Sequence, residues 1–104
     1  MTQQLTDETF ASAINDGGLV VVDFGAAWCG PCRALAPQYE ALSEAYEGKA
    51  KFYKVDIDEA QETAANLGIM SVPTLLFFKG GQIATKSIGL KSKEQLAQIV
   101  EGLL

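Results

Sequence analysis

The sequence of 104 residues contains no histidine and only two cysteines. Without histidine the chain has no Ser–His or Cys–His nucleophile pair, no zinc-protease motif and no histidine ligand for haem or zinc. Two cysteines are too few for a closed four-cysteine zinc site within one chain. We therefore expect no bound metal and no cofactor, and most familiar enzyme classes are excluded.

Long apolar runs and basic clusters are also missing. The longest apolar runs, Leu19 to Val22 and Leu75 to Phe78, fall far short of the ~20 residues that cross a bilayer, so no membrane span is expected. The eight basic residues are scattered and the net charge is −5, which argues against a nucleic-acid surface. The first residues lack the basic and apolar blocks of a signal peptide, so we expect a cytoplasmic protein.

The chain has the length and apolar content of one globular unit. Compact domains cluster near about 100–150 residues, and 48% of this sequence is hydrophobic, which is too much for a disordered coil. We expect a single domain over residues 1–104, acting as a monomer.

Helix and strand patterns alternate along the chain. Thr6 can cap the first helix, with Asp7 in its first turn, and Ser92 can cap the last. Gly80-Gly81 predicts a two-residue hairpin turn between antiparallel strands. The expected helices cover residues 7–16, 31–47, 59–67 and 92–102, and the expected strands cover 19–25, 51–57, 74–79 and 82–88, with a possible short strand over 2–5. This order predicts an α/β fold with a mixed, twisted sheet and helices on both faces.

The motif Cys29-Gly30-Pro31-Cys32 follows an apolar strand and opens the next helix, which is where open α/β sheets place their sites. Pro31 suits the first helical position, where its missing N–H loses nothing. Cysteines three apart at a helix start share a face, within the roughly 4.4–6.8 Å Cα separation of a disulfide. Cys29 faces the unsatisfied N–H groups of the helix, which favours its thiolate and makes it the nucleophile. Cys32 lies one turn inside, where we expect it to be shielded and to act as the resolving thiol.

Three interpretations of this cysteine pair are open. Half of a zinc site would need ligands from a second chain, because no histidine can help. Two inert core cysteines would be an odd use of a tight Gly-Pro turn. A redox dithiol is favoured by the βαβ pattern around the motif.

The chain resembles the thioredoxin family over essentially its whole length. The stretches that carry the resemblance are Asp23-Phe24, Trp28-Cys29-Gly30-Pro31-Cys32, Pro37, Lys54-Val55-Asp56-Ile57-Asp58, Val72-Pro73-Thr74 and Gly89. The resemblance implies a thioredoxin fold, with a five-stranded mixed β-sheet flanked by four α-helices in three αβα layers. It also implies a protein-disulfide reductase that a thioredoxin reductase recharges, and thus an electron carrier rather than a classical enzyme. Gly25 and Ala27 depart from the family pattern, in which larger or more polar side chains are usual, and they bear on partner preference.

Two charged residues gain expected roles from the resemblance. Asp23 is either a strand-end carboxylate that faces solvent or a buried carboxylate with a raised pKa that accepts the proton of Cys32, directly or through a water. Lys54 resembles the family lysine beside this aspartate, although alone it would pass as an exposed strand residue.

Four further residues are expected to form the substrate-binding groove. Sequence alone favours a trans Val72–Pro73 bond, whereas the resemblance implies a cis bond packed against the two sulfurs. The backbone of Val72 could then pair with an extended substrate peptide. Trp28 is either a core side chain or an amphipathic wall of the docking surface. Gly89 leaves room for an incoming backbone on the other side.

The residues between the cysteines set the expected direction of electron transfer. A histidine there would stabilise the reduced form and make an oxidant, whereas Gly30 and Pro31 tune the pair toward reduction. The expected partners are thioredoxin reductase and disulfide-containing substrate proteins. An alternative function of a different class is a binding module, which would use the same groove as a clamp in a larger assembly.

Overall fold

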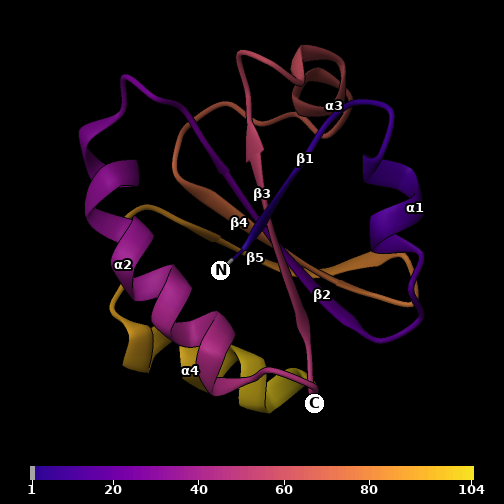
Figure 1. Ribbon diagram of the computed structural model, residues 1–104, viewed down its shortest axis with the longest axis vertical. Coiled ribbons are helices and arrows are strands. Elements are labelled where there is room, and N and C mark those ends of the chain that lie inside the picture. The colour runs from indigo at the N-terminus through magenta and orange to yellow at the C-terminus, as the bar shows by residue number, and fades with distance from the viewer. Residues whose placement is uncertain (1) are drawn as a thin grey trace.

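One five-stranded sheet forms the centre of the fold in the computed structural model, which describes residues 2–104 (Figure 1). Its strands are β1 (Gln3–Leu5), β2 (Leu19–Gly25), β3 (Lys51–Asp56), β4 (Thr74–Lys79) and β5 (Gln82–Ile88), in the spatial order β1-β3-β2-β4-β5. β3 pairs in parallel with both β1 and β2, whereas β4 pairs antiparallel with β2 and β5. The sheet is therefore mixed, as the sequence predicted.

Four helices cover the two faces of this sheet. They are α1 (Phe10–Ile14), α2 (Gly30–Ala45), α3 (Gln61–Asn66) and α4 (Lys93–Leu103). α2 and α4 lie on one face, and α1 and α3 lie on the other (Figure 1). The expected fold class, a thioredoxin fold of three αβα layers, is thus confirmed.

β2 contributes side chains to two hydrophobic cores, one on each face of the sheet, because its side chains alternate between the faces. Leu19 and Val21 pack with α2 and α4, while Val20, Val22 and Phe24 pack with α1 and the start of α3. These five side chains are nearly fully buried, and each contributes about 1.5–3 kcal/mol through the hydrophobic effect. The alternation also places Asp23 on the α2 face, at the end of the strand where the cysteine motif begins.

Two local signals in the sequence are confirmed in detail. Gly80 and Gly81 adopt φ angles of 62° and 79°, the conformation that a two-residue hairpin turn requires. Ser92 accepts a hydrogen bond from the Gln95 N–H at 3.1 Å, and the Gln95 side chain accepts one from the Ser92 N–H at 2.9 Å. This reciprocal capping box begins α4.

The expected helix over residues 7–16 is wrong at both ends, since α1 covers only Phe10–Ile14. Thr9, not Thr6, is its N-cap residue. The carboxylate of Asp7 instead accepts hydrogen bonds from the backbone N–H and the hydroxyl of Thr63, at 2.8 and 2.6 Å. Asp7 therefore connects the α1 loop to α3, a contact between residues 56 positions apart that local patterns cannot reveal.

The other helix bounds shift by one or two residues. The helix expected over 31–47 is α2, Gly30–Ala45, so Pro31 is its second residue rather than its first, where the missing N–H is still harmless. The helix expected over 59–67 is α3, Gln61–Asn66, because residues 56–60 form a turn in which the Asp56 carbonyl accepts the N–H groups of Glu59 and Ala60.

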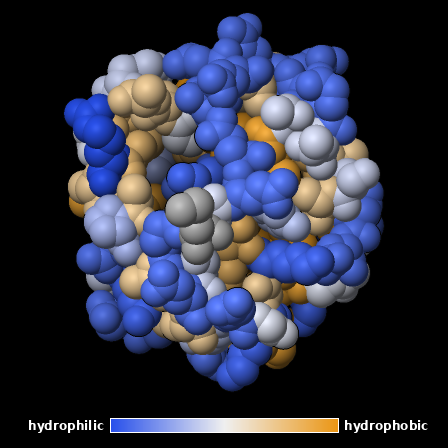
Figure 2. Space-filling view, viewed as in Figure 1, coloured by the Kyte–Doolittle hydropathy of each residue, from blue (hydrophilic) through white to orange (hydrophobic). Residues whose placement is uncertain are grey.

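Most of the surface seen in Figure 2 is hydrophilic, with a few apolar residues recessed between polar ones. No helix within residues 2–104 is long and apolar enough to cross a membrane.

Candidate active site

The two cysteines form a disulfide at the first turn of α2, with their Cα atoms 5.2 Å apart. Cys29 is the N-cap residue, and its Sγ accepts a hydrogen bond from the Cys32 N–H at 3.1 Å. This N–H is one of the unsatisfied donors of the helix start, and α2 continues for 16 residues. A negative charge on Cys29 Sγ would therefore be stabilised by a hydrogen bond and by the helix dipole.

The exposure of Cys32 differs from the expectation. Cys29 is only 4% exposed, whereas Cys32 is partly exposed and lines an open cleft. The prediction that Cys32 is shielded is thus wrong. The physical reason is Gly25, whose Cα faces the Cys32 side chain and provides no side chain to cover it.

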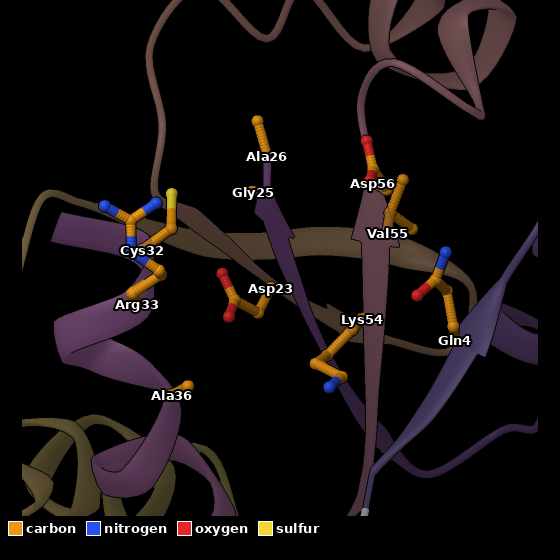
Figure 3. A pocket seen from close by; sticks show the side chains of 10 residues that line it. All are labelled: Gln4, Asp23, Gly25, Ala26, Cys32, Arg33, Ala36, Lys54, Val55 and Asp56. Carbon is orange, nitrogen blue, oxygen red and sulfur yellow. The ribbon is translucent and has the colours of Figure 1, made fainter. Parts of the chain in front are cut away.

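Asp23 lies under α2 and is only 7% exposed, so the solvent-facing interpretation is wrong. Its Oδ1 atom has no hydrogen-bond partner in the part of the chain that the structure describes. Burial disfavours the charged carboxylate and raises the pKa of Asp23 from 3.8 to about 7, although the charge of Lys54 lowers it in part. Asp23 lines the same cleft as Cys32 (Figure 3).

Lys54 is the direct register partner of Asp23 in the parallel pair β2–β3. Its side chain is half-buried and also lines the cleft, so the interpretation as an ordinary exposed strand residue is wrong. Within residues 2–104 no ion pair joins the two side chains directly, and the lysine acts on the aspartate by charge alone.

Val72 and Pro73 lie beside Cys29, and the bond between them is cis, as the family resemblance implies and the sequence alone did not. The Val72 carbonyl oxygen is 3.7 Å from Cys29 Sγ, a contact rather than a hydrogen bond because the disulfide sulfur carries no proton. The Gly89 N–H donates to the Pro73 carbonyl at 2.9 Å, which places Gly89 next to this loop. Gly89 adopts a φ of 92°, and a Cβ there would meet nothing within 4 Å, so open space remains beside the loop.

Trp28 is 66% exposed and is not a core residue. Its indole N–H donates to Asp58 Oδ2 at 2.8 Å, and the Asp56 carboxylate in turn accepts the N–H of Asp58 at 2.9 Å. The sequence did not predict this contact between Trp28 and Asp58, which are 30 residues apart. The proximity of these two residues could have been predicted from the parallel pairing of β2 and β3. Trp28 follows β2 and Asp58 follows β3, and residues that follow parallel neighbours meet at one edge of the sheet.

All the residues expected at the site lie at this edge. Cys29 contacts Val72, the loop of Val72 and Pro73 contacts Gly89, and Trp28 precedes the disulfide. Gly30 and Pro31 form the first two residues of α2 between the cysteines. On the other side of the disulfide, Asp23 and Lys54 line the cleft with Cys32.

A disulfide at a helix start, at the edge of a mixed sheet covered on both faces, defines a thiol–disulfide oxidoreductase. Comparison with known proteins agrees. The sequence model of the family described as Thioredoxin matches residues 1–102. The chain belongs to the thioredoxin family.

Individual relatives match over nearly the whole chain. A protein named Thioredoxin from Alicyclobacillus acidocaldarius subsp. acidocaldarius is 48% identical over 103 residues, which are 98% of this chain and 98% of that protein. A protein named Thioredoxin from Staphylococcus aureus (strain Mu50 / ATCC 700699) is 46% identical over 98 residues, 94% of this chain and 93% of that protein.

Proposed function

We propose that this protein reduces disulfide bonds of other proteins through Cys29 and Cys32. In the reduced form the Cys29 thiolate attacks a substrate disulfide and forms a mixed disulfide. Cys32 then attacks Cys29 Sγ, which releases the reduced substrate and restores the disulfide within the chain. The observation that carries this proposal is the 3.1 Å hydrogen bond from the Cys32 N–H to Cys29 Sγ, because it stabilises the attacking thiolate.

Asp23 is the proposed proton acceptor for Cys32 in the second step. A thiol must lose its proton before it attacks, and a base whose pKa lies near 7 takes protons efficiently around neutral pH. Burial gives Asp23 such a pKa, and Asp23 lines the same cleft as Cys32, through which a water could relay the proton. The charge of Lys54 counters the effect of burial and keeps the pKa of Asp23 from rising further.

The proposed substrate groove runs beside Cys29. An extended peptide would pair with the backbone of Val72, next to the cis bond to Pro73. The open space at Gly89 supports this placement, and the exposed indole of Trp28 provides an amphipathic wall.

The direction of electron transfer is proposed to be reducing. Gly30 and Pro31 offer no side-chain donor to a thiolate, and the chain has no histidine to stabilise the reduced form. A thioredoxin reductase is the proposed source of electrons and disulfide-containing proteins are the proposed substrates. In this cycle the protein is a single-domain, monomeric electron carrier in the cytoplasm.

Reduction of insulin disulfides in the presence of a thioredoxin reductase tests this function. We expect the wild-type chain to accelerate insulin precipitation and the Cys29→Ser, Cys32→Ser double variant to be inactive. Absence of activity in the wild-type chain would contradict the proposal. Equal binding of a target by the wild-type chain and the double variant, without insulin reduction, would instead support a docking role.

A further inference from the structure

An open cleft of about 200 Å³ lies beside the disulfide, between the ends of β2 and β3 and the first turns of α2 (Figure 3). Pockets that hold drug-sized ligands usually measure about 300–1,000 Å³, so this cleft suits a smaller molecule. Its apolar wall suits a short carbon chain, and its charged groups suit a polar head. The apolar wall includes Ala26, Ala36 and Val55, and the charged groups are Asp23, Arg33, Lys54 and Asp56.

Cys32 is the cysteine that this cleft reaches. It belongs to the lining of the cleft, whereas Cys29 does not and is 4% exposed. The gap at Gly25 creates this access, because a Cβ at that position would lie 3.3 Å from Cys32 Sγ and 3.5 Å from its Cβ.

A polar group in the cleft also lacks a partner. Oδ1 of Asp23 is buried, accepts no hydrogen bond from the described residues, and belongs to a side chain on the cleft wall. Because Oδ1 is enclosed, a ligand hydroxyl would bond to the more exposed charged groups of Arg33 or Lys54 on the same wall. The cleft therefore offers a small polar molecule charged side chains to bind its polar head and access to Cys32.

We propose that the cleft is a binding site for low-molecular-weight thiols, which reduce the disulfide by attacking Cys32 Sγ instead of Cys29 Sγ. This goes beyond the proposed function, in which protein substrates meet Cys29 in the groove beside Val72. The redox site would then react at two different sulfur atoms. Protein substrates would react at Cys29 Sγ, and small thiols would react at Cys32 Sγ.

The reaction balances with two molecules of the thiol. The thiolate of the first forms a bond to Cys32 Sγ, the Cys29–Cys32 bond breaks, and Cys29 leaves as a thiolate. The thiolate of the second attacks the sulfur of the first, which yields the small disulfide and releases Cys32. The protein gains two electrons and the two thiols lose them, while the thiol protons pass to the cysteines through Asp23 or water.

The choice of sulfur follows from the leaving group. In thiol–disulfide exchange the better-stabilised thiolate leaves faster. Attack on Cys32 expels Cys29, whose charge is stabilised by the Cys32 N–H at 3.1 Å. Attack on Cys29 would expel Cys32, whose Sγ accepts no hydrogen bond from residues 2–104 and which shares the cleft with the carboxyl of Asp23. Access through the cleft and the stability of the leaving thiolate thus both favour attack on Cys32 Sγ.

Single-cysteine variants test the proposal through the second exchange run in reverse, in which the remaining cysteine thiolate attacks a small disulfide and expels a small thiolate. The Cys29→Ser variant retains Cys32, and the Cys32→Ser variant retains Cys29. The probe is 2-hydroxyethyl disulfide, and mass spectrometry follows adduct formation as a function of pH. Rates are compared on their high-pH plateaus, where both thiols are ionised, so that the ratio of the Cys32 rate to the Cys29 rate reports access.

Gly25→Ala, made in both backgrounds, should lower this ratio by at least about fivefold, because exchange rates depend on access to the sulfur. Gly102→Ala is the matched control, since a Cβ there meets nothing within 4 Å, and it should leave the ratio unchanged. A ratio that Gly25→Ala leaves unchanged, or a Cys32 that does not react with the probe, would overturn the proposal.

A second comparison needs no glycine variant and holds even if Gly25→Ala does not fold. The ratio of the Cys32 rate to the Cys29 rate should be at least about tenfold higher for 2-hydroxyethyl disulfide than for insulin, which cannot enter the cleft. Equal ratios for the two probes would overturn the proposal. The insulin assay on the wild-type chain with its reductase tests the proposed function separately, so failure of one is distinguishable from failure of the other.

Discussion

The indole N–H of Trp28 donates a 2.8 Å hydrogen bond to the carboxylate of Asp58, 30 residues further along the chain. The ring is 66% exposed, yet this bond fixes its orientation next to the disulfide. The loop after β3 is held in turn by the bond from the Asp58 N–H to Asp56. The acidic loop is therefore a support for the wall of the proposed substrate groove, in addition to being a solvated surface.

Asp58→Ala should raise the KM for insulin about fivefold and change kcat less, because a hydrogen bond of this kind is worth about 1 kcal/mol. Trp28 is the only tryptophan, so its fluorescence anisotropy should fall in the variant as the ring gains freedom. Asp16→Ala is the matched control, since Asp16 pairs with Lys51 instead, at 2.9 Å. Equal effects of the two substitutions on KM or anisotropy would contradict the role of Asp58.

Asp23 should make the folded protein less stable as the pH rises. Its folded pKa of about 7 exceeds its ordinary value of 3.8, so the native state holds more protons than the unfolded state between these pH values. The free energy of unfolding therefore falls from about pH 4 to about pH 7, and the penalty is absent below the lower value. At about 1.4 kcal/mol per pKa unit, the total penalty is about 4 kcal/mol.

Asp23→Asn removes this titration. We expect the variant to gain about 4 kcal/mol relative to the wild-type chain between pH 4 and pH 8, as measured by urea denaturation. The other titrating groups are present in both proteins, so their contributions cancel in the difference between the two unfolding free energies. Stability curves that stay parallel across this range would show that the carboxyl is solvated. The variant should also release substrate from the mixed disulfide more slowly, since Cys32 has lost its proposed base.

Lys54→Met should raise the pKa of Asp23, because the lysine charge is what lowers it against the effect of burial. The midpoint of the fall in stability should then move to higher pH, and NMR titration of the Asp23 carboxyl carbon should show the same shift. Lys51→Met is the matched control on the same strand, because Lys51 pairs with Asp16. An unchanged Asp23 midpoint in Lys54→Met would mean that the lysine does not act on the aspartate.

The reduced cysteines should differ in ionisation. Near pH 7, iodoacetamide should label Cys29 before Cys32, because the helix N–H groups favour the Cys29 thiolate. The preference should weaken as the pH rises and Cys32 also ionises, which mass spectrometry of the labelled chain can follow. Faster labelling of Cys32 at pH 7 would reverse the assigned roles. Ionisation thus favours Cys29, while the cleft gives small molecules access to Cys32.

Features that depend on neighbours in the sequence were predicted correctly. The hairpin at Gly80-Gly81, the cap at Ser92 and the cysteine pair at a helix start each involve residues at most three positions apart. The alternation of helix and strand patterns also predicted a mixed sheet with helices on both faces. Backbone sterics, helix geometry and periodicity act over these short distances, so the sequence by itself determined the element order and the chemistry of the motif.

Contacts between distant segments decided the rest. Packing of α2 over β2 buries Asp23 and raises its pKa, and the missing side chain of Gly25 exposes Cys32, contrary to the prediction. Asp7 bonds to Thr63 instead of beginning α1. Burial, and the pairing of a polar group with a distant residue, depend on how the helices and strands pack in space, which no local pattern of residues specifies.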